Sequence, residues 1–192
     1  MSSTNQAKSN LVENLQQFTQ KFITQYQSEH GNLPQIEKDD DWPSPCESLI
    51  SENEKNVFWR PISITSEQEL SFENVEKALE LSLHPDIKTF FTSIFSESIN
   101  ATCEEGDLSL LFAWNKADFQ RLQENIIGHI LMKQRLKQKE TVFFAVTDEE
   151  DMIISLDNET GSVCVERVGC EPHKQLATSL AQFIGELTPL ID

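Results

Sequence analysis

The sequence has little positive charge and no long run of apolar residues. Its 192 residues include 15 lysines and arginines against 32 aspartates and glutamates, which gives a formal net charge of −17. Such a chain repels nucleic acid and bare anionic lipid and attracts basic protein segments. The longest apolar runs, such as VFFAV at 142–146, have about five residues, whereas a membrane-spanning helix needs about 20. We therefore expect no nucleic-acid partner and no transmembrane segment.

Glycine and proline are also scarce, at 6 and 7 residues, which argues against a low-complexity or linker-dominated chain. The first ten residues contain no apolar run of the kind found in a signal peptide. The four cysteines form no CxxC pair, so we expect reduced thiols and a cytosolic protein. The length and the 12 phenylalanines fit one domain over residues 1–192 with a sizeable core.

Motifs that carry catalytic chemistry are missing. The chain contains no GxxxxGK[ST] or GxGxxG phosphate loop, no HExxH, and no Cys/His set with zinc spacing. We therefore predict no catalytic residue, no cofactor and no metal site. His129 lies on the flank of an apolar helix stripe, and we interpret it as a half-buried structural histidine. A hydrolase that uses His129 and nearby acids remains the alternative.

The first third of the chain divides into a helix and an irregular segment. Apolar residues at spacings of three and four predict a helix over residues 8–29, which Gly31 and Pro34 would end. Residues 35–54 lack periodicity and hold seven acids and two prolines. We interpret this segment as an acidic loop.

The rest of the chain alternates helices with hairpins. We expect a strand at 57–60, two short helices, a hairpin around EEGD, and a helix of about 24 residues capped by Asn115. Three strands joined by DEED and NETG would follow, with SVCVERV at 162–168 as the last strand before a closing helix. Tight turns imply antiparallel pairing. The predicted fold class is α+β: one domain with a mixed or antiparallel sheet and helices packed on it.

Acidic residues gather in three clusters, two of them in the predicted hairpin turns. A solvated, solubilising surface is the plainer interpretation of any single cluster. If the clusters converge on one face, the sequence predicts a docking surface for a basic partner, with binding that weakens in salt. The candidate partner-binding residues are Glu37, Asp39, Asp40, Asp41, Glu104, Glu105, Asp107, Asp148, Glu149, Glu150 and Asp151.

Residues 116–140 are the one basic stretch, with six lysines and arginines against three acids. The cations at its end are Lys133, Arg135, Lys137 and Lys139. Cations at a helix C-terminus offset the helix dipole, and this alone accounts for them. Weak contact with anionic lipid headgroups is the second interpretation, at about 1 kcal/mol per residue near a membrane.

Five segments together resemble the Syd family of bacterial SecY-interacting proteins. They occur in the same order over nearly the whole chain, and WPSPC and QENIIGH are the most specific parts. The acidic run 37–41 departs most from the family pattern. The segments are WPSPC at 42–46, VFWRP at 57–61, HPDIKTFFTSIFS at 84–96, RLQENIIGHILMKQRLK at 121–137 and VCVERVGCEPHKQLATSLAQFI at 163–184.

The resemblance implies an SMI1/KNR4-like (SUKH-like) domain without enzymatic activity. Such a protein would dock an electronegative concave face on basic cytosolic loops of SecY and would monitor or restrain SecY that is not properly assembled. It would act as a peripheral monomer on the cytoplasmic side of the inner membrane, with a soluble cytoplasmic pool. The alternative is an immunity-type SMI1/KNR4-like module that binds another basic protein, such as a toxin nuclease.

Overall fold

A curled antiparallel sheet forms the centre of the molecule. The computed structural model describes residues 2–50 and 55–191, with side chains from residue 10 onward. The large sheet has the strand order β11-β10-β9-β8-β7-β6-β12, and each neighbouring pair is antiparallel. Its strands are β6 (Ile99–Cys103), β7 (Gly106–Leu110), β8 (Thr141–Thr147), β9 (Met152–Asp157), β10 (Val163–Arg167), β11 (Lys174–Ala177) and β12 (Thr188–Pro189).

Two smaller sheets complete the β-structure. A three-stranded antiparallel sheet has the order β1-β3-β2, and β4 pairs with β5. Their strands are β1 (Gln35–Glu37), β2 (Glu47–Ile50), β3 (Asn56–Trp59), β4 (Ile62–Ser63) and β5 (Ile94–Phe95).

Helices cover both faces of the large sheet. The α-helices are α1 (Ser2–His30), α2 (Glu73–Leu79), α3 (Pro85–Ser93), α4 (Lys116–Arg135) and α5 (Leu180–Glu186), with a 3-10 turn at Ser66–Gln68. Successive residues of β8 point to opposite faces. Phe143 meets His129 of α4, with ring centroids 5.5 Å apart, and Phe144 meets Phe90 of α3 and Phe183 of α5 at 5.4 and 5.9 Å.

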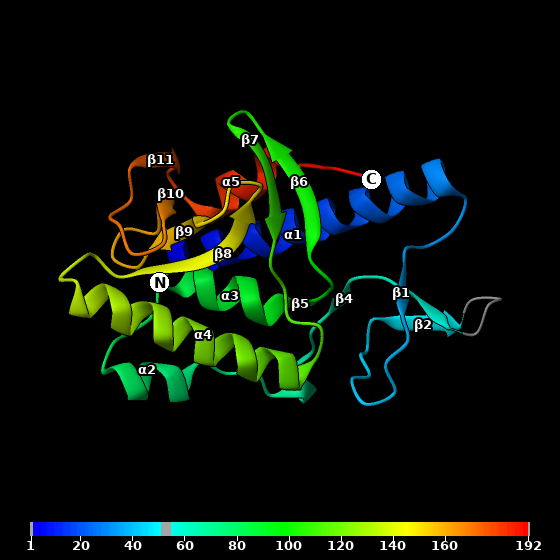
Figure 1. Cartoon of the computed structure of the whole chain (residues 1–192), viewed down its shortest axis with the longest axis horizontal. Helices are drawn as coiled ribbons and strands as arrows, with labels where there is room; N and C mark the ends of the chain where they lie inside the picture. Colours follow the sequence, from blue (N-terminus) through cyan, green and yellow to red (C-terminus); the bar gives the residue numbers. More distant parts are fainter. Residues whose placement is uncertain (1, 51–54, 192) are drawn as a thin grey trace.

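Helix α1, the longest helix, extends the hydrophobic core from the large sheet to the three-stranded sheet. Figure 1 shows α1 and α4 along the long axis, with the end of α1 reaching toward β1 and β2. Phe22 of α1 stacks on Trp59 of β3 at 5.9 Å, and Trp59 meets Trp114 edge-on at 6.0 Å. This row of rings fixes the small sheet against the start of α4.

The predicted fold class is confirmed: one α+β domain with antiparallel pairing throughout the named strands. The EEGD hairpin and the Asn115 cap are also confirmed, since β6 pairs with β7 and the Asn115 side chain accepts from Asp118 N. Helix α4 has 20 residues, fewer than the expected length of about 24, because it ends at Arg135. Helix α1 includes the predicted segment 8–29 and begins earlier, at Ser2.

Two predictions about secondary structure are wrong. The segment 35–54 is not simply an acidic loop, because β1 and β2 lie within it; residues 51–54 are outside the described chain. These strands have only three and four residues and mostly exposed side chains, which is too short a pattern to predict a strand from the sequence. The strand at 162–168 is not the last one, because β11 and the two-residue β12 follow it.

A buried polar cluster lies between α4 and the sheet. Lys133 and Glu166 are both fully buried, and the Lys133 Nζ lies 3.3 Å from Glu166 Oε1 and donates to Cys170 O at 2.7 Å. Glu166 also accepts from Thr141 Oγ1 at 3.0 Å and from Ser155 Oγ at 2.9 Å. The charged pair is therefore well supplied with hydrogen bonds, which a buried ion pair requires. Since Lys133 has no exposed surface, its predicted contact with lipid is wrong.

His129 belongs to the same cluster and is 8% exposed. Its Nε2 lies 3.0 Å from Thr141 Oγ1 and 3.6 Å from Glu166 Oε1. Burial lowers the pKa of His129 to about 4, and the neighbouring Lys133 ammonium adds to the effect. The fold therefore holds the neutral imidazole as a core group, in agreement with the structural interpretation of this residue.

We predict that Lys133→Met destabilises the protein by about 3–5 kcal/mol, because it leaves the Glu166 carboxylate buried without its cation. The free energy of unfolding is measured by urea denaturation followed by circular dichroism. The control is Lys139→Met, an exposed position in the same basic segment, which should change stability by less than about 0.5 kcal/mol. Equal losses in the two variants would contradict a structural role for the pair.

The depressed pKa of His129 predicts a pH-dependent contribution to stability. In the unfolded chain a histidine takes up a proton near pH 6.5, and the folded chain does so only near pH 4. As the pH falls through this window, the unfolded state binds more protons, and up to about 3 kcal/mol of stability is lost. We expect the stability difference between the native protein and His129→Gln to shrink from pH 7.5 to pH 4 in urea titrations. A difference that stays constant with pH would contradict this account.

Candidate binding surface

Two of the predicted acidic clusters meet at one end of the sheet. Because β7 pairs antiparallel with β8, the β6–β7 turn and the β8–β9 turn leave the sheet on the same side. A hollow of about 220 Å³ between them is lined by acids from both turns. We name this region the turn surface, and its acidic residues, all exposed, are Glu104, Glu105, Asp107, Asp148, Glu149, Glu150 and Asp151.

The curl of the sheet brings one counterion to the turn surface. Lys174 of β11 forms an ion pair with Glu105, although β10, β9 and β8 stand between β11 and the hairpin in the sheet order. His173 and Leu176 line the same hollow. The Lys174–Glu105 pair is about half exposed, so it adds little stability and neutralises only part of the charge.

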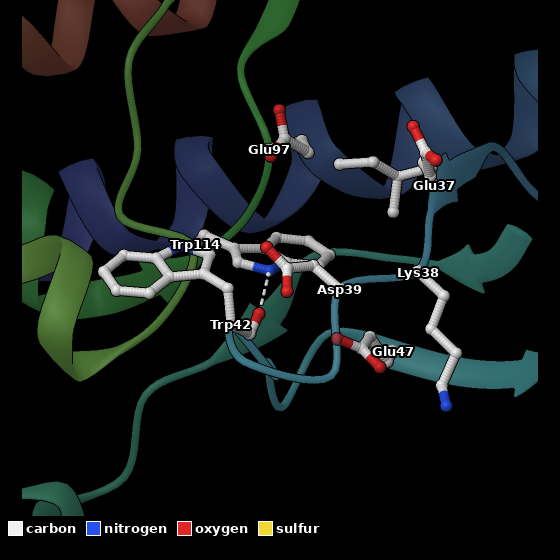
Figure 2. Close-up of a pocket in the computed structure, with 8 residues that line it drawn as sticks. Glu37, Lys38, Asp39, Trp42, Glu47, Glu97 and Trp114 are labelled. Atoms are coloured by element: carbon white, nitrogen blue, oxygen red, sulfur yellow. Dashed lines mark hydrogen bonds between the residues drawn. The ribbon is translucent and has the colours of Figure 1, made fainter.

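A second hollow of about 390 Å³ lies at the small sheet, and Figure 2 shows it in close-up. Two tryptophans and an isoleucine line it, and four carboxylates from three segments of the chain surround it. We name it the indole pocket, and its lining residues are Ile36, Glu37, Lys38, Asp39, Trp42, Glu47, Glu97 and Trp114.

Hydrogen bonds join the PSPC motif to the start of α4 and so shape the indole pocket. The Trp114 Nε1 donates to Trp42 O at 3.3 Å, drawn as the dashed line in Figure 2. Asn115 Nδ2 donates to Pro43 O at 2.9 Å, and the Ser44 hydroxyl donates to Trp114 O. Trp114 is only 6% exposed, so its indole is a rigid part of the wall.

The electrostatics of the indole pocket favour a positive charge. Burial raises the pKa of the Glu97 carboxyl, which is half-buried. Lys38 is the cation among the lining residues, and it forms an ion pair with Asp40. Among the described residues, no ion pair neutralises Glu37, Asp39, Glu47 or Glu97.

The three predicted clusters therefore occupy two places. Glu37 and Asp39 line the indole pocket, and Asp40 and Asp41 lie next to it on the exposed turn. The other two clusters share the turn surface. Strand β6 joins the two regions, because Glu97 precedes it and Glu104 follows it, and its five residues span about 16 Å.

Glu47, Glu97, Trp42 and Trp114 were missed as site residues. Glu47 and Glu97 stand as single acids between uncharged neighbours, and no sequence pattern links them to residues 37–41. Tertiary packing alone brings them together. Within the described chain, no group of three or more His, Cys, Asp or Glu residues is arranged to hold a metal ion. No helix in that part is both long enough and apolar enough to cross a membrane.

Comparisons with known proteins agree on one family. The family model described as Syd protein (SUKH-2) matches residues 12–189. Protein Syd of Colwellia psychrerythraea is 56% identical over 195 residues, which cover 98% of this chain and 96% of that protein. Protein Syd of Pseudoalteromonas atlantica is 43% identical over 183 residues, 94% of this chain and 97% of that protein. Protein Syd of Pectobacterium atrosepticum is 38% identical over 180 residues, with the same two coverages.

We predict that Asn115→Ala lowers the free energy of unfolding by about 2–3 kcal/mol, because it removes both the cap of α4 and the bond to Pro43 O. Asn115→Ser keeps a capping oxygen without reaching Pro43, so about half of that loss is expected. Urea denaturation measures both variants. Identical losses for alanine and serine would show that the cap contributes nothing.

Proposed function

The chain belongs to the Syd family, and on this basis we propose that it is a peripheral protein without enzymatic activity that binds basic cytosolic loops of SecY. It acts at the cytoplasmic side of the inner membrane, where it monitors or restrains the assembly of the SecY translocase. The observation that supports this function is the pair of acidic hollows at the two ends of β6.

The acidic surface is suited to a basic partner because its charge is concentrated and largely unpaired. Seven acids gather at the turn surface, and Lys174 is the one described lysine or arginine in an ion pair with them. Like charges held together cost stability in the free protein. A basic loop that approaches relieves this repulsion, and it is attracted over about 8 Å at physiological salt. Fast, salt-sensitive association follows.

The candidate contact residues remain those of the turn surface and of the turn beside the indole pocket. Glu104, Glu105 and Asp107 lie in one hairpin, and Asp148 to Asp151 lie in the next. Because both turns lie at one end of the sheet, we propose that a single basic segment contacts them at the same time. Asp39, Asp40 and Asp41 contact a second part of the partner.

The basic end of α4 contributes weakly to membrane association. Arg135, Lys137 and Lys139 are exposed, and Leu131 and Leu136 in the same region are each 48% exposed. Cations beside exposed leucines suit the headgroup region of an anionic bilayer. We propose that these residues assist after SecY is engaged. Lys133 takes no part because it is buried.

Co-sedimentation with membranes from cells that overproduce SecY tests the proposal. We expect the native protein to bind, and we expect Asp148→Lys/Glu149→Lys and Asp39→Lys/Asp40→Lys each to lower the affinity at least tenfold, because they reverse charge where the partner docks. Raising the salt to 1 M, where charges are screened within about 3 Å, should release the native protein.

The matched control is Glu13→Lys/Glu124→Lys, which makes the same change in net charge at exposed positions on α1 and α4. It should bind nearly as well as the native protein. Charge reversals in the two acidic regions that leave binding undiminished would refute docking through these acids. Vesicles of anionic lipid without SecY measure the lipid contribution separately, and recovery of a soluble nuclease from lysate would favour an immunity-type module.

A further inference from the structure

The indole pocket has a shape and chemistry that the turn surface lacks. It is a hollow of about 390 Å³ with an apolar wall, and its four carboxylates come from three segments of the chain. Glu37 lies in β1, Asp39 in the turn after it, Glu47 in β2, and Glu97 just before β6. Figure 2 shows these carboxylates around the space beside the Trp114 indole.

We propose that the indole pocket holds one arginine side chain of the bound partner. The proposal rests on the function proposed above, that the protein binds a basic segment, and it adds an anchoring residue and its place. In this arrangement the turn surface attracts the segment at a distance, and the indole pocket fixes its register.

A partner cation suits the pocket because four carboxylates line it and Lys38 is the one cation among its lining residues. None of its four carboxylates forms an ion pair within the described residues, and Lys38 is engaged with Asp40. Glu97 is half-buried, so its charge lacks part of the hydration that an exposed carboxylate has. A partner cation beside Glu97 replaces that hydration with direct hydrogen bonds.

A long side chain fits the pocket better than a metal ion. The described carboxylates do not form a group that could coordinate a metal. The wall of Ile36 and the two indoles is apolar, and such a wall suits the hydrocarbon stem of lysine or arginine while the charged head stays among the acids.

The guanidinium group is favoured over the ammonium group by two observations. The chain itself places a guanidinium over one of the two indoles, since Arg121 Cζ, which does not line the pocket, lies 5.2 Å from the centre of the Trp42 ring. The indole at the rim therefore has an electrostatic environment that accepts arginine. The carboxylates also surround the space from several sides. A planar guanidinium has five donors that point in several directions, whereas an ammonium acts as a point charge.

Isothermal titration calorimetry with synthetic peptides tests the proposal. The probe is a ten-residue peptide with one central arginine and three flanking lysines. Two analogues replace the arginine with lysine, which keeps the charge, or with citrulline, which keeps the shape and removes the charge. For the native protein we expect the lysine peptide to bind about fivefold more weakly and the citrulline peptide at least tenfold more weakly.

Variants of the protein test whether the preference for the arginine peptide arises in the indole pocket. Glu97→Gln should weaken the arginine peptide about tenfold and remove most of its advantage over citrulline. The matched control is Glu104→Gln, which removes the same charge from the turn surface and should weaken all three peptides about twofold. Asp39→Asn, at an exposed position, is a second pocket variant, and thermal unfolding verifies that each variant is folded.

The outcomes separate this proposal from the proposed function. If the peptides bind but Glu97→Gln behaves like Glu104→Gln, or if citrulline binds as well as arginine, the pocket is not an arginine site and acidic docking still stands. Equal binding of the lysine and arginine peptides overturns the choice of arginine. Failure of all three peptides to bind the native protein overturns the arginine site, whereas the proposed function is overturned only if SecY-containing membranes also fail to retain the protein.

Discussion

The ion pair between Lys133 and Glu166 fixes how α4 lies on the sheet, and the indole pocket takes its position from the other end of that helix. Its two charges are fully buried, and Thr141, Ser155 and the Cys170 carbonyl complete its hydrogen bonds. At the other end of α4, the Asn115 side chain both caps the helix and binds the segment that forms the indole pocket. Helix α4, held by polar contacts at both ends, therefore sets the distance between the indole pocket and the large sheet. A buried ion pair adds little net stability as a whole, but the removal of one partner is costly, so the pair disfavours arrangements that separate Lys133 from Glu166.

The rigid framework holds acidic residues close together although their charges repel one another. A net charge of −17 on a domain of this size opposes compactness, and the turn surface and the indole pocket concentrate that charge. The core compensates with a continuous aromatic interior, in which Phe90, Phe144 and Phe183 pack across the face opposite α4. The protein thus maintains a local excess of negative charge at some cost in stability.

Local patterns in the sequence were enough to predict the hairpins, the Asn115 cap and the α+β class, because each depends on residues close together in the chain. The resemblance of five ordered segments was enough to identify the family. The small sheet could not be predicted, because β1 and β2 are short and exposed and exist only through pairing with β3. Lys133 was misinterpreted for a related reason: its basic neighbours suggest an exposed surface, and only the distant Glu166 explains its burial. Glu47, Glu97 and Trp114 meet the acidic run 37–41 through tertiary packing, which a one-dimensional pattern does not contain.

The aromatic row from α1 to the indole pocket has an optical consequence. The chain has three tryptophans, and all of them lie in this one region: Trp42 and Trp114 line the pocket, and Trp59 meets Trp114 edge-on. The intrinsic fluorescence of the protein therefore originates almost wholly beside the small sheet and hardly at all near the turn surface. The protein therefore contains an intrinsic fluorescent probe, and its tryptophan emission responds to changes at the indole pocket.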